Sequence, residues 1–401
     1  MKRLIIALFS AMIFLCGCNQ KPTDEAQTII KFSSWGSRTE YNILKQVISD
    51  YEKANPDVKV EFIHVPENYF RKLHLLYASK TEPDVVFVNN IYAPLYIKAG
   101  LFEDLSDKFD EEAYYQSALD CFKYNDKLYA IPRDISSLVL YINKDLIKNP
   151  QKITDIYTLE AEAKKATKNG VFGLNYEENP LFWNTYLGYF DGGILSDDGK
   201  RIVFGETGSI KGLQLYADMI NKDKSIPHKW DMAAMTSAQM FIGGKTAIYL
   251  SGRWLVPKFN ETVKFDWDVI PFPQTKTSKT LVDASGWAIS KSSKHKEKAI
   301  DFVKYLSSEE VSEKFTETGL ITPARKKIAE SEIFLNPNKK PRNSRAFLDA
   351  LNQSKPTPVN ENYLKITDEI TKKLENVFNG KKQASEVVDQ KFVEKLQKYC
   401  N

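Results

Sequence analysis

The stretch 127-KLYAIPRDISSLVLYINKDLI-147 decides the fold class of this chain. Its extended, largely apolar pattern continues well beyond the length of an ordinary strand, which is about five or six residues. Pro132 interrupts the pattern, because proline removes a backbone donor from a strand ladder. A strand of that length can pass from one lobe of a protein into another. The stretch therefore predicts a chain of two lobes.

Strands and helices alternate on the N-terminal side of this stretch. Short apolar runs at 28–35, 58–65 and 84–88 are typical of strands, and the last is the continuous kind found in parallel sheets. Helical spacing of apolar residues lies between and after them, at 38–54, 68–79 and 93–99. This alternation predicts a doubly wound α/β lobe. Beyond residue 147 the pattern becomes helix-rich, with later strands at 245–252 and 265–273.

The first residues have the pattern of an export signal. Lys2 and Arg3 precede an uncharged apolar run at 4–15, which is too short to span a bilayer but has the length of a signal-peptide core. The tetrapeptide 15-LCGC-18 resembles the bacterial lipobox, in which the last cysteine receives a diacylglycerol. The resemblance implies a signal peptide over 1–17, lipid on Cys18, a linker over 18–27, and export to the outer side of the cell membrane. An ordinary secretory signal is the alternative.

Composition and motifs exclude several classes of function. The net charge is only +4 and no basic block is present, so nucleic acid is not expected as a partner. The four histidines have no metal-ligand spacing, and no phosphate loop or nucleophile elbow occurs. We therefore expect no cofactor, no metal and no catalytic residue. Cys121 and Cys400 are expected to be free thiols, with one bridge between them as the alternative.

Seven segments in order resemble one family. They are 29-IIKFSSW-35, 50-DYEKANPDVKVEF-62, 77-YASKTEPDVVFVNN-90, 99-AGLFEDLSD-107, 124-YNDKLYAIPRDISSLVLYINKDL-146, 240-MFIGGKTAIYLSGRW-254 and 286-GWAISKSSKHKEKAIDFVKYLSS-308. Together they resemble the maltodextrin-binding-like family, the extracellular solute-binding proteins of sugar-type ABC importers. The likeness covers about residues 28 to 325.

The resemblance implies a two-lobed, periplasmic-binding-protein-like α/β fold with discontinuous lobes and hinge strands. We expect lobe I at 28–136 and 285–321, and lobe II at 137–284 and 322–401. The hinges would lie near 135–137, 283–285 and 321–323. The implied function is capture of a carbohydrate between the lobes and its delivery to the membrane subunits of an ABC permease, without catalysis. We expect a monomer.

Candidate ligand contacts follow from the chemistry of a sugar. Aromatic rings match its C–H faces, and planar polar groups match its hydroxyls. The tryptophans at loop-like positions are candidate stacking surfaces, with most weight on the two beside a glycine, Trp254 and Trp287; the others are Trp35, Trp183 and Trp230. Trp267 lies inside a strand and is assigned to the core. Polar candidates after strands or near the hinges are Arg38, Asn68, Asn90, Asp134, Asp283 and Arg325.

Two alternatives remain open at this point. The same fold could bind a polyamine, a peptide or an anion instead of a sugar, and several Trp and Asp residues could form an acidic aromatic cage. A lipid-anchored glycosidase would need two suitably spaced carboxylates. No sequence motif supports the enzyme.

Overall fold

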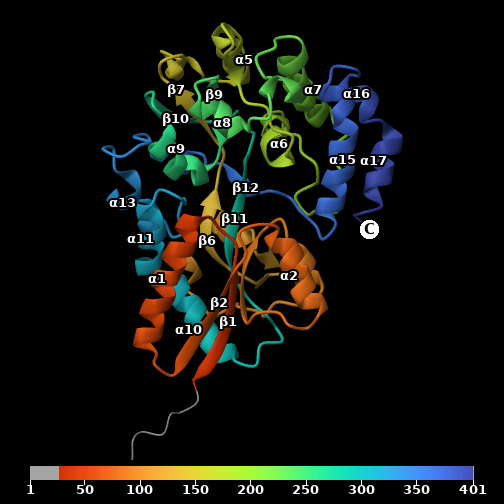
Figure 1. Cartoon of the computed structure of the whole chain (residues 1–401). Helices are drawn as coiled ribbons and strands as arrows, with labels where there is room; N and C mark the ends of the chain where they lie inside the picture. Colours follow the sequence, from red (N-terminus) through yellow and green to blue (C-terminus); the bar gives the residue numbers. More distant parts are fainter. Residues whose placement is uncertain (1–26, 401) are drawn as a thin grey trace, which may run out of the picture.

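The computed structural model describes residues 27–400, which form two lobes, one above the other in Figure 1. The predicted signal peptide and Cys18 lie outside the described residues. Within residues 27–400, no helix has the length and apolarity needed to cross a membrane. Cys121 and Cys400 are both free, as the sequence analysis favoured.

The lower lobe contains a six-stranded sheet in the order β12-β11-β3-β1-β2, with β6 also paired to β11. Its strands are β1 (Thr28–Ser34), β2 (Val58–His64), β3 (Val85–Asn89), β6 (Ile131–Ser136), β11 (Thr280–Ile289) and β12 (Ser354–Pro356). β1 runs parallel to β2 and β3, whereas β11 runs antiparallel to β3 and β6. The connecting helices include α1 (Arg38–Ala54), α2 (Tyr69–Ala78), α3 (Ala93–Lys98), α10 (Lys296–Leu306) and α11 (Glu309–Glu317). The predicted doubly wound α/β arrangement is confirmed.

The upper lobe contains a four-stranded sheet in the order β10-β7-β9-β8. Its strands are β7 (Val139–Asn143), β8 (Phe172–Leu174), β9 (Thr246–Ser251) and β10 (Trp267–Pro271). Side chains alternate along β7, as a strand requires. Leu140 and Ile142 face the helices α5 (Ile156–Ala166), α6 (Pro180–Tyr189), α7 (Thr207–Asn221) and α15 (Tyr363–Phe378). Val139 and Tyr141 face the other way, into a core that continues into the lower lobe.

The remaining short elements complete the two lobes. They are β4 (Lys123–Tyr124), β5 (Lys127–Leu128), α4 (Gln116–Asp120), α8 (Ser237–Ile242), α9 (Val256–Thr262), α12 (Lys326–Ala329), α13 (Glu332–Leu335), α14 (Arg345–Asp349), α16 (Ala384–Val387) and α17 (Gln390–Gln397). Trp267 is 1% exposed and packs on Tyr141 and Phe259, so its assignment to the core is confirmed.

The long extended stretch is two successive strands that belong to different sheets. β6 ends at Ser136 in the lower sheet and β7 begins at Val139 in the upper sheet, so the chain changes lobe at Ser137 and Leu138. β12 pairs with Thr280–Val282 at the start of β11, and the sequence analysis assigned both segments to lobe II, so the exact division of the lobes stays a prediction. A three-residue strand that ends in a proline has no periodicity by which the sequence could reveal it.

Candidate ligand-binding cleft

In each sheet, the carboxyl ends of the parallel strands face the other lobe. In the upper lobe Val139 pairs with Ser251, so the last residue of β9 lies beside the point where the chain arrives from below. β8 runs parallel to β9 and ends on the same side. In the lower lobe Ser285 lies opposite both Asn89 and Asp134, so β3 and β6 end at a common edge. The ends of β1, β3, β6, β8 and β9 therefore lie near the boundary between the two lobes.

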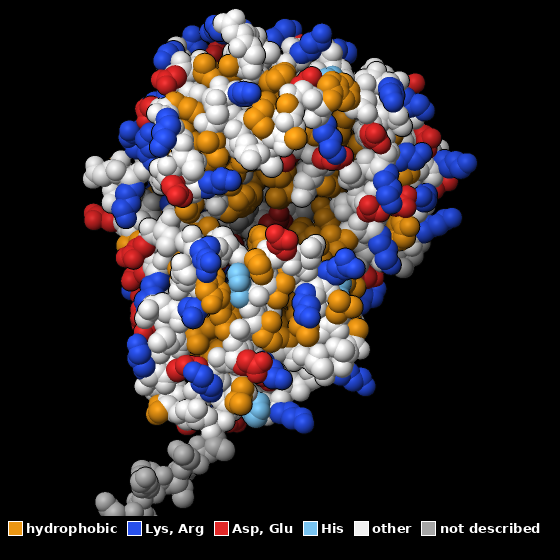
Figure 2. Space-filling view, in the orientation of Figure 1, with side chains coloured by type: hydrophobic (Ala, Val, Ile, Leu, Met, Phe, Trp, Pro, Cys, Tyr) orange, Lys and Arg blue, Asp and Glu red, His pale blue; other side chains and the backbone are white. Residues whose placement is uncertain are grey.

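Figure 2 shows that the molecule is hollowed between the two lobes on this face. Hydrophobic side chains line much of the hollow, and Asp or Glu side chains lie within it. An apolar wall with a few polar groups is the usual composition of a small-molecule site.

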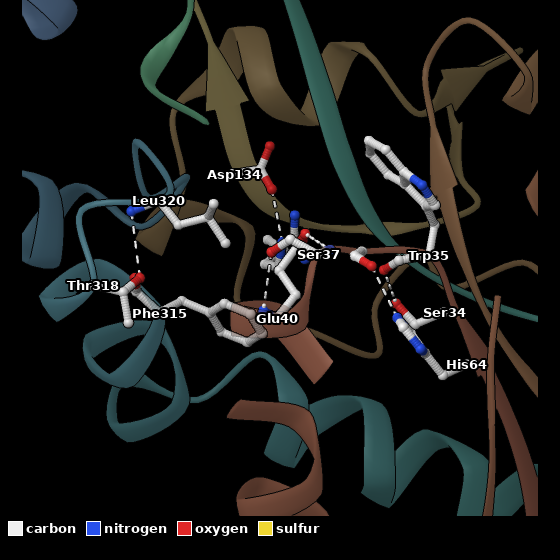
Figure 3. A network of polar contacts seen from close by, with 11 residues as sticks. Ser34, Trp35, Ser37, Glu40, His64, Asp134, Phe315, Thr318 and Leu320 are labelled. Carbon is white, nitrogen blue, oxygen red and sulfur yellow. Dashed lines mark hydrogen bonds and ion pairs between the residues drawn. The ribbon is translucent and has the colours of Figure 1, made fainter. Parts of the chain in front are cut away.

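A buried charge network lies where the lower sheet meets the hollow. Arg133 donates from Nη1 to Glu40 over 3.1 Å and from Nε to Asp134 over 2.7 Å (Figure 3). All three side chains are at most 8% exposed. Three aromatic rings surround the guanidinium, with centroids 5.0–5.5 Å away: Phe87, Trp287 and Phe315. Two carboxylates share one guanidinium, so the fully ionised network has a net charge of about −1.

The pKa directions agree with this picture. Burial raises the pKa of Asp134, and the charge of Arg133 opposes that rise. Burial acts to lower the pKa of Arg133, but the Asp134 and Glu40 carboxylates outweigh it and raise the pKa. One oxygen of Asp134 accepts from Arg133 Nε, and the carboxylate also accepts a bond from the Ser285 backbone. The protein therefore fixes the position of the Asp134 carboxylate.

Trp35 directly follows the carboxyl end of β1. Its side chain is 45% exposed, and its indole N–H donates to the Pro66 carbonyl over 3.0 Å. Nearby, His64 Nε2 bonds the Gly36 carbonyl over 2.9 Å, and Ser37 caps α1 through a capping box with Glu40 (Figure 3). The polar edge of the ring is thus fixed while much of the ring stays accessible. This is the geometry that a stacking surface needs.

Trp254 occupies the corresponding position in the upper lobe. It lies in the turn Arg253–Leu255 that follows β9, and it is 36% exposed. A Cβ built on Gly252 would stand 1.9 Å from a carbon of its ring. Glycine at 252 therefore makes room for the tryptophan ring itself.

The sequence analysis missed Tyr176 and Glu177, which follow β8 toward the hollow. Burial raises the pKa of Glu177, with bonds from Ser237 and Asn175 opposing the rise. Asn175 also accepts the Leu250 amide over 2.8 Å, which ties this loop to β9. β8 has only three residues, so no periodic pattern marked a strand or the residues that follow it.

Two of the five candidate tryptophans are core residues, which corrects that part of the expectation. Trp183 is 0% exposed and donates to the Glu178 carbonyl over 3.0 Å. Trp287 is also 0% exposed and packs edge-on against Phe32 and Phe87. Neither has a ring face open to a ligand in this structure. Trp287 looked loop-like because it follows a glycine, but Gly286 is a strand residue packed on the Ile131 backbone.

Two polar candidates bond each other instead of facing the hollow. Asn90 is 1% exposed; its Nδ2 donates to Asp283 over 2.8 Å and its Oδ1 accepts from the Ala284 amide over 3.0 Å. Burial raises the pKa of Asp283, opposed by bonds from Asn90 and Thr357. The pair braces β3 against β11. The sequence analysis expected Asn90 and Asp283 to contact the ligand. This expectation is corrected, because the polar groups of Asn90 are already bonded within the protein.

The other candidates are on the surface or fixed elsewhere. Arg38 and Asn68 are exposed at the starts of α1 and α2. Trp230 is 61% exposed and stacks on His228. Arg325 donates to the Ser307 carbonyl over 2.6 Å and lies over the Tyr114 ring. Over the part of the chain that the structure describes, no cluster of His, Cys, Asp or Glu could hold a metal ion.

Comparison with known proteins identifies relatives along nearly the whole chain. The family model for bacterial extracellular solute-binding proteins matches residues 35–313. The galactooligosaccharide-binding protein of Bacillus subtilis is 25% identical over 94% of this chain and 92% of its own length. The multiple sugar-binding protein of Streptococcus mutans is 26% identical over 76% of this chain and 77% of its own.

Solved structures give the same answer. An ABC substrate-binding protein from Listeria monocytogenes, in complex with cycloalternan, superposes with a TM-score of 0.84. It is 25% identical and covers 93% of this chain and 98% of its own. The GacH receptor of Streptomyces glaucescens, solved unliganded and with acarbose, superposes with a TM-score of 0.80 at 20% identity, over 94% and 99% of the two chains.

Proposed function

The chain belongs to the bacterial extracellular solute-binding protein family, and on that premise we propose that it captures a carbohydrate between its two lobes. It would deliver the sugar to the membrane subunits of an ABC importer and would not alter it chemically. The proposal rests on one observation. Each lobe has an accessible tryptophan just after the carboxyl end of a strand: Trp35 after β1 in the lower lobe and Trp254 after β9 in the upper lobe.

The chemistry of the hollow suits a sugar. Trp35 and Trp254 offer apolar ring faces to the C–H faces of a pyranose. Asp134 offers a carboxylate, which accepts charge-assisted bonds from hydroxyl groups. Glu177 is a second acceptor at the carboxyl end of β8. Similarity to proteins that are named for galactooligosaccharides and multiple sugars, or were solved with cycloalternan, supports an oligosaccharide over a single sugar ring.

Capture would require the lobes to close. Contacts from Trp35 and Trp254 to one ligand exist together only when both lobes touch it, so ligand binding favours the closed state. We further propose that the protein works as a monomer on the outer side of the membrane, held there by lipid on Cys18. Two acyl chains would make that attachment durable.

Calorimetric titration with a panel of oligosaccharides tests the proposal. The panel contains galactooligosaccharides, maltooligosaccharides and cycloalternan, with spermidine and a short peptide as the other ligand classes. We expect one oligosaccharide to bind with about micromolar affinity or better, near −8 kcal/mol. Ligand recovered by chromatography after long incubation should be intact, and hydrolysis would contradict the non-catalytic assignment.

A polyamine is the second candidate, and the charge network favours it. Glu40 and Asp134 together exceed the one positive charge of Arg133, which suits a cationic ligand. Binding of spermidine with no binding of any sugar would replace our proposal with this one.

A further inference from the structure

A cavity of about 180 Å³ lies beside the cleft, where α9 of the upper lobe meets the end of α11 and α13 (left side of Figure 1). Arg253, Thr316, Gly319, Phe334, Lys339 and Ser344 are among its lining residues. It lies close to the buried charge network of the cleft, because Arg133 lies over the Phe315 ring and residues 316–319 line the cavity.

Arg253 is buried in the wall of this cavity without a counter-charge. It is 6% exposed and forms no ion pair with any residue in the range 27–400. Its Nη1 donates to Ser344 Oγ over 3.2 Å, and its buried Nε has no partner in the same range. Burial lowers the pKa of Arg253 to about 10, so the guanidinium is charged at neutral pH.

Arg253 lacks the counter-charges that the other buried arginine, Arg133, has. Both guanidinium groups are buried and both lie over aromatic rings, at 4.1 Å from Phe334 in the case of Arg253. Arg133 has two carboxylates, whereas Arg253 has one neutral hydroxyl. A buried cation with so little compensation is unfavourable, and cation–π contact offsets only part of that. A guanidinium has five donors in a planar fork, which matches an oxyanion.

The other charges at the cavity favour an anion on balance. Lys339 is exposed and makes no ion pair within the described part of the chain, while Lys340 is paired with Asp266 over 2.9 Å. Glu317 opposes an anion, as does the carbonyl end of α11. Glu317 is exposed, however, and forms no ion pair with Arg253.

We propose that this cavity binds a small oxyanion on the Arg253 guanidinium, with Lys339 adding positive charge. Phosphate, sulfate and a compact carboxylate share the required chemistry. The anion could be a free ion, or an acidic group on a sugar that lies in the adjoining cleft. Because Arg253 opens the turn that carries Trp254, the bound anion would also fix that ring. Binding of a free ion at Arg253 does not depend on the sugar proposal.

Calorimetric titration of phosphate-free protein with sodium phosphate, and separately with sodium sulfate, tests the site. We expect saturable binding of one ion per chain. Arg253→Gln should weaken it about thirtyfold or more. Glu317→Gln should tighten it and Lys339→Gln should weaken it, each about threefold. Lys291→Gln, at an exposed lysine of the lower lobe, is the matched control and should leave the affinity unchanged.

Galacturonate and galactose distinguish the two sources of the anion. An acidic sugar is the source if galacturonate competes with phosphate while galactose does not. A free ion is the source if neither sugar competes. Displacement of phosphate by galactose would overturn the proposal, as would a response that sodium chloride reproduces at equal ionic strength. If Arg253→Gln does not fold, unchanged affinity in both Glu317→Gln and Lys339→Gln would overturn it.

Discussion

Arg133 and Asp134 are sequence neighbours whose side chains form a buried ion pair, with Nε of the arginine 2.7 Å from Oδ2 of the aspartate. Successive residues of a regular strand point to opposite faces. The pairing of β6 with β11 shifts register near this point, between Ser285 and Gly286. At this irregularity both side chains belong to one charge network, which also includes Glu40 of α1.

Removal of the shared cation should destabilise the protein strongly. Arg133→Met would leave Glu40 and Asp134 buried together without a counter-charge, and we expect a loss of about 3–5 kcal/mol in the free energy of unfolding. Urea denaturation monitored by circular dichroism measures it. Arg345→Met is the control, because its ion pair with Glu330 is about half exposed and should contribute less than about 1 kcal/mol. Similar losses in both variants would contradict the structural role of the network.

Asp283 gives a prediction about pH. Burial raises its pKa in the folded state above the ordinary 3.8, so the folded protein binds a proton at pH values where the unfolded chain does not. The contribution of Asp283 to stability therefore increases as pH falls from above its folded-state pKa toward 3.8. Asp283→Asn should raise stability at neutral pH and reduce this dependence. Urea denaturation at several pH values tests it, and an unchanged slope would contradict it.

The sequence predicted features that depend on local pattern. Pro132 within a long extended run indicated the change of lobe, and Trp267 inside a strand indicated a core residue. Trp183 and Trp287 could not be separated from Trp35 and Trp254, because burial of a ring depends on what packs over it. The contact of Arg133 with Glu40 joins residues 93 positions apart and leaves no local signal.

Gly252 should control the orientation of Trp254. Its backbone φ is −92°, so alanine is tolerated by the backbone itself. The added Cβ would nevertheless stand 1.9 Å from the ring, so the ring must move. We expect Gly252→Ala to weaken ligand binding as much as Trp254→Ala does, with folding retained. Calorimetry on both variants measures it, and Gly193→Ala is the control, since its Cβ would meet nothing closer than 3.7 Å.

The lipid anchor is tested at Cys18, which lies outside the described residues. Cys18→Ser should prevent lipid attachment, so the protein should be recovered as an uncleaved or soluble form. Cys16→Ser should have no such effect, because residue 16 would be removed with the signal peptide. Cell fractionation and mass spectrometry of the mature N-terminus distinguish the outcomes. Normal maturation and full membrane retention of the Cys18 variant would refute the anchor.

The tryptophans divide into two groups that mutation should separate. Trp35→Ala and Trp254→Ala remove accessible rings, so each should weaken binding of a confirmed ligand by about tenfold, since a stacked ring contributes about 0.5–1.5 kcal/mol. The melting temperature of the empty protein should change little.

Trp183→Ala and Trp287→Ala remove rings that are 0% exposed, and each should lower the free energy of unfolding by about 3–5 kcal/mol. Calorimetry and urea denaturation on all four variants give both quantities for each ring. Trp183 and Trp287 lie in different cores, so the two losses should be independent. If Trp35 and Trp254 prove necessary for stability but not for affinity, the ligand does not lie between the facing strand ends.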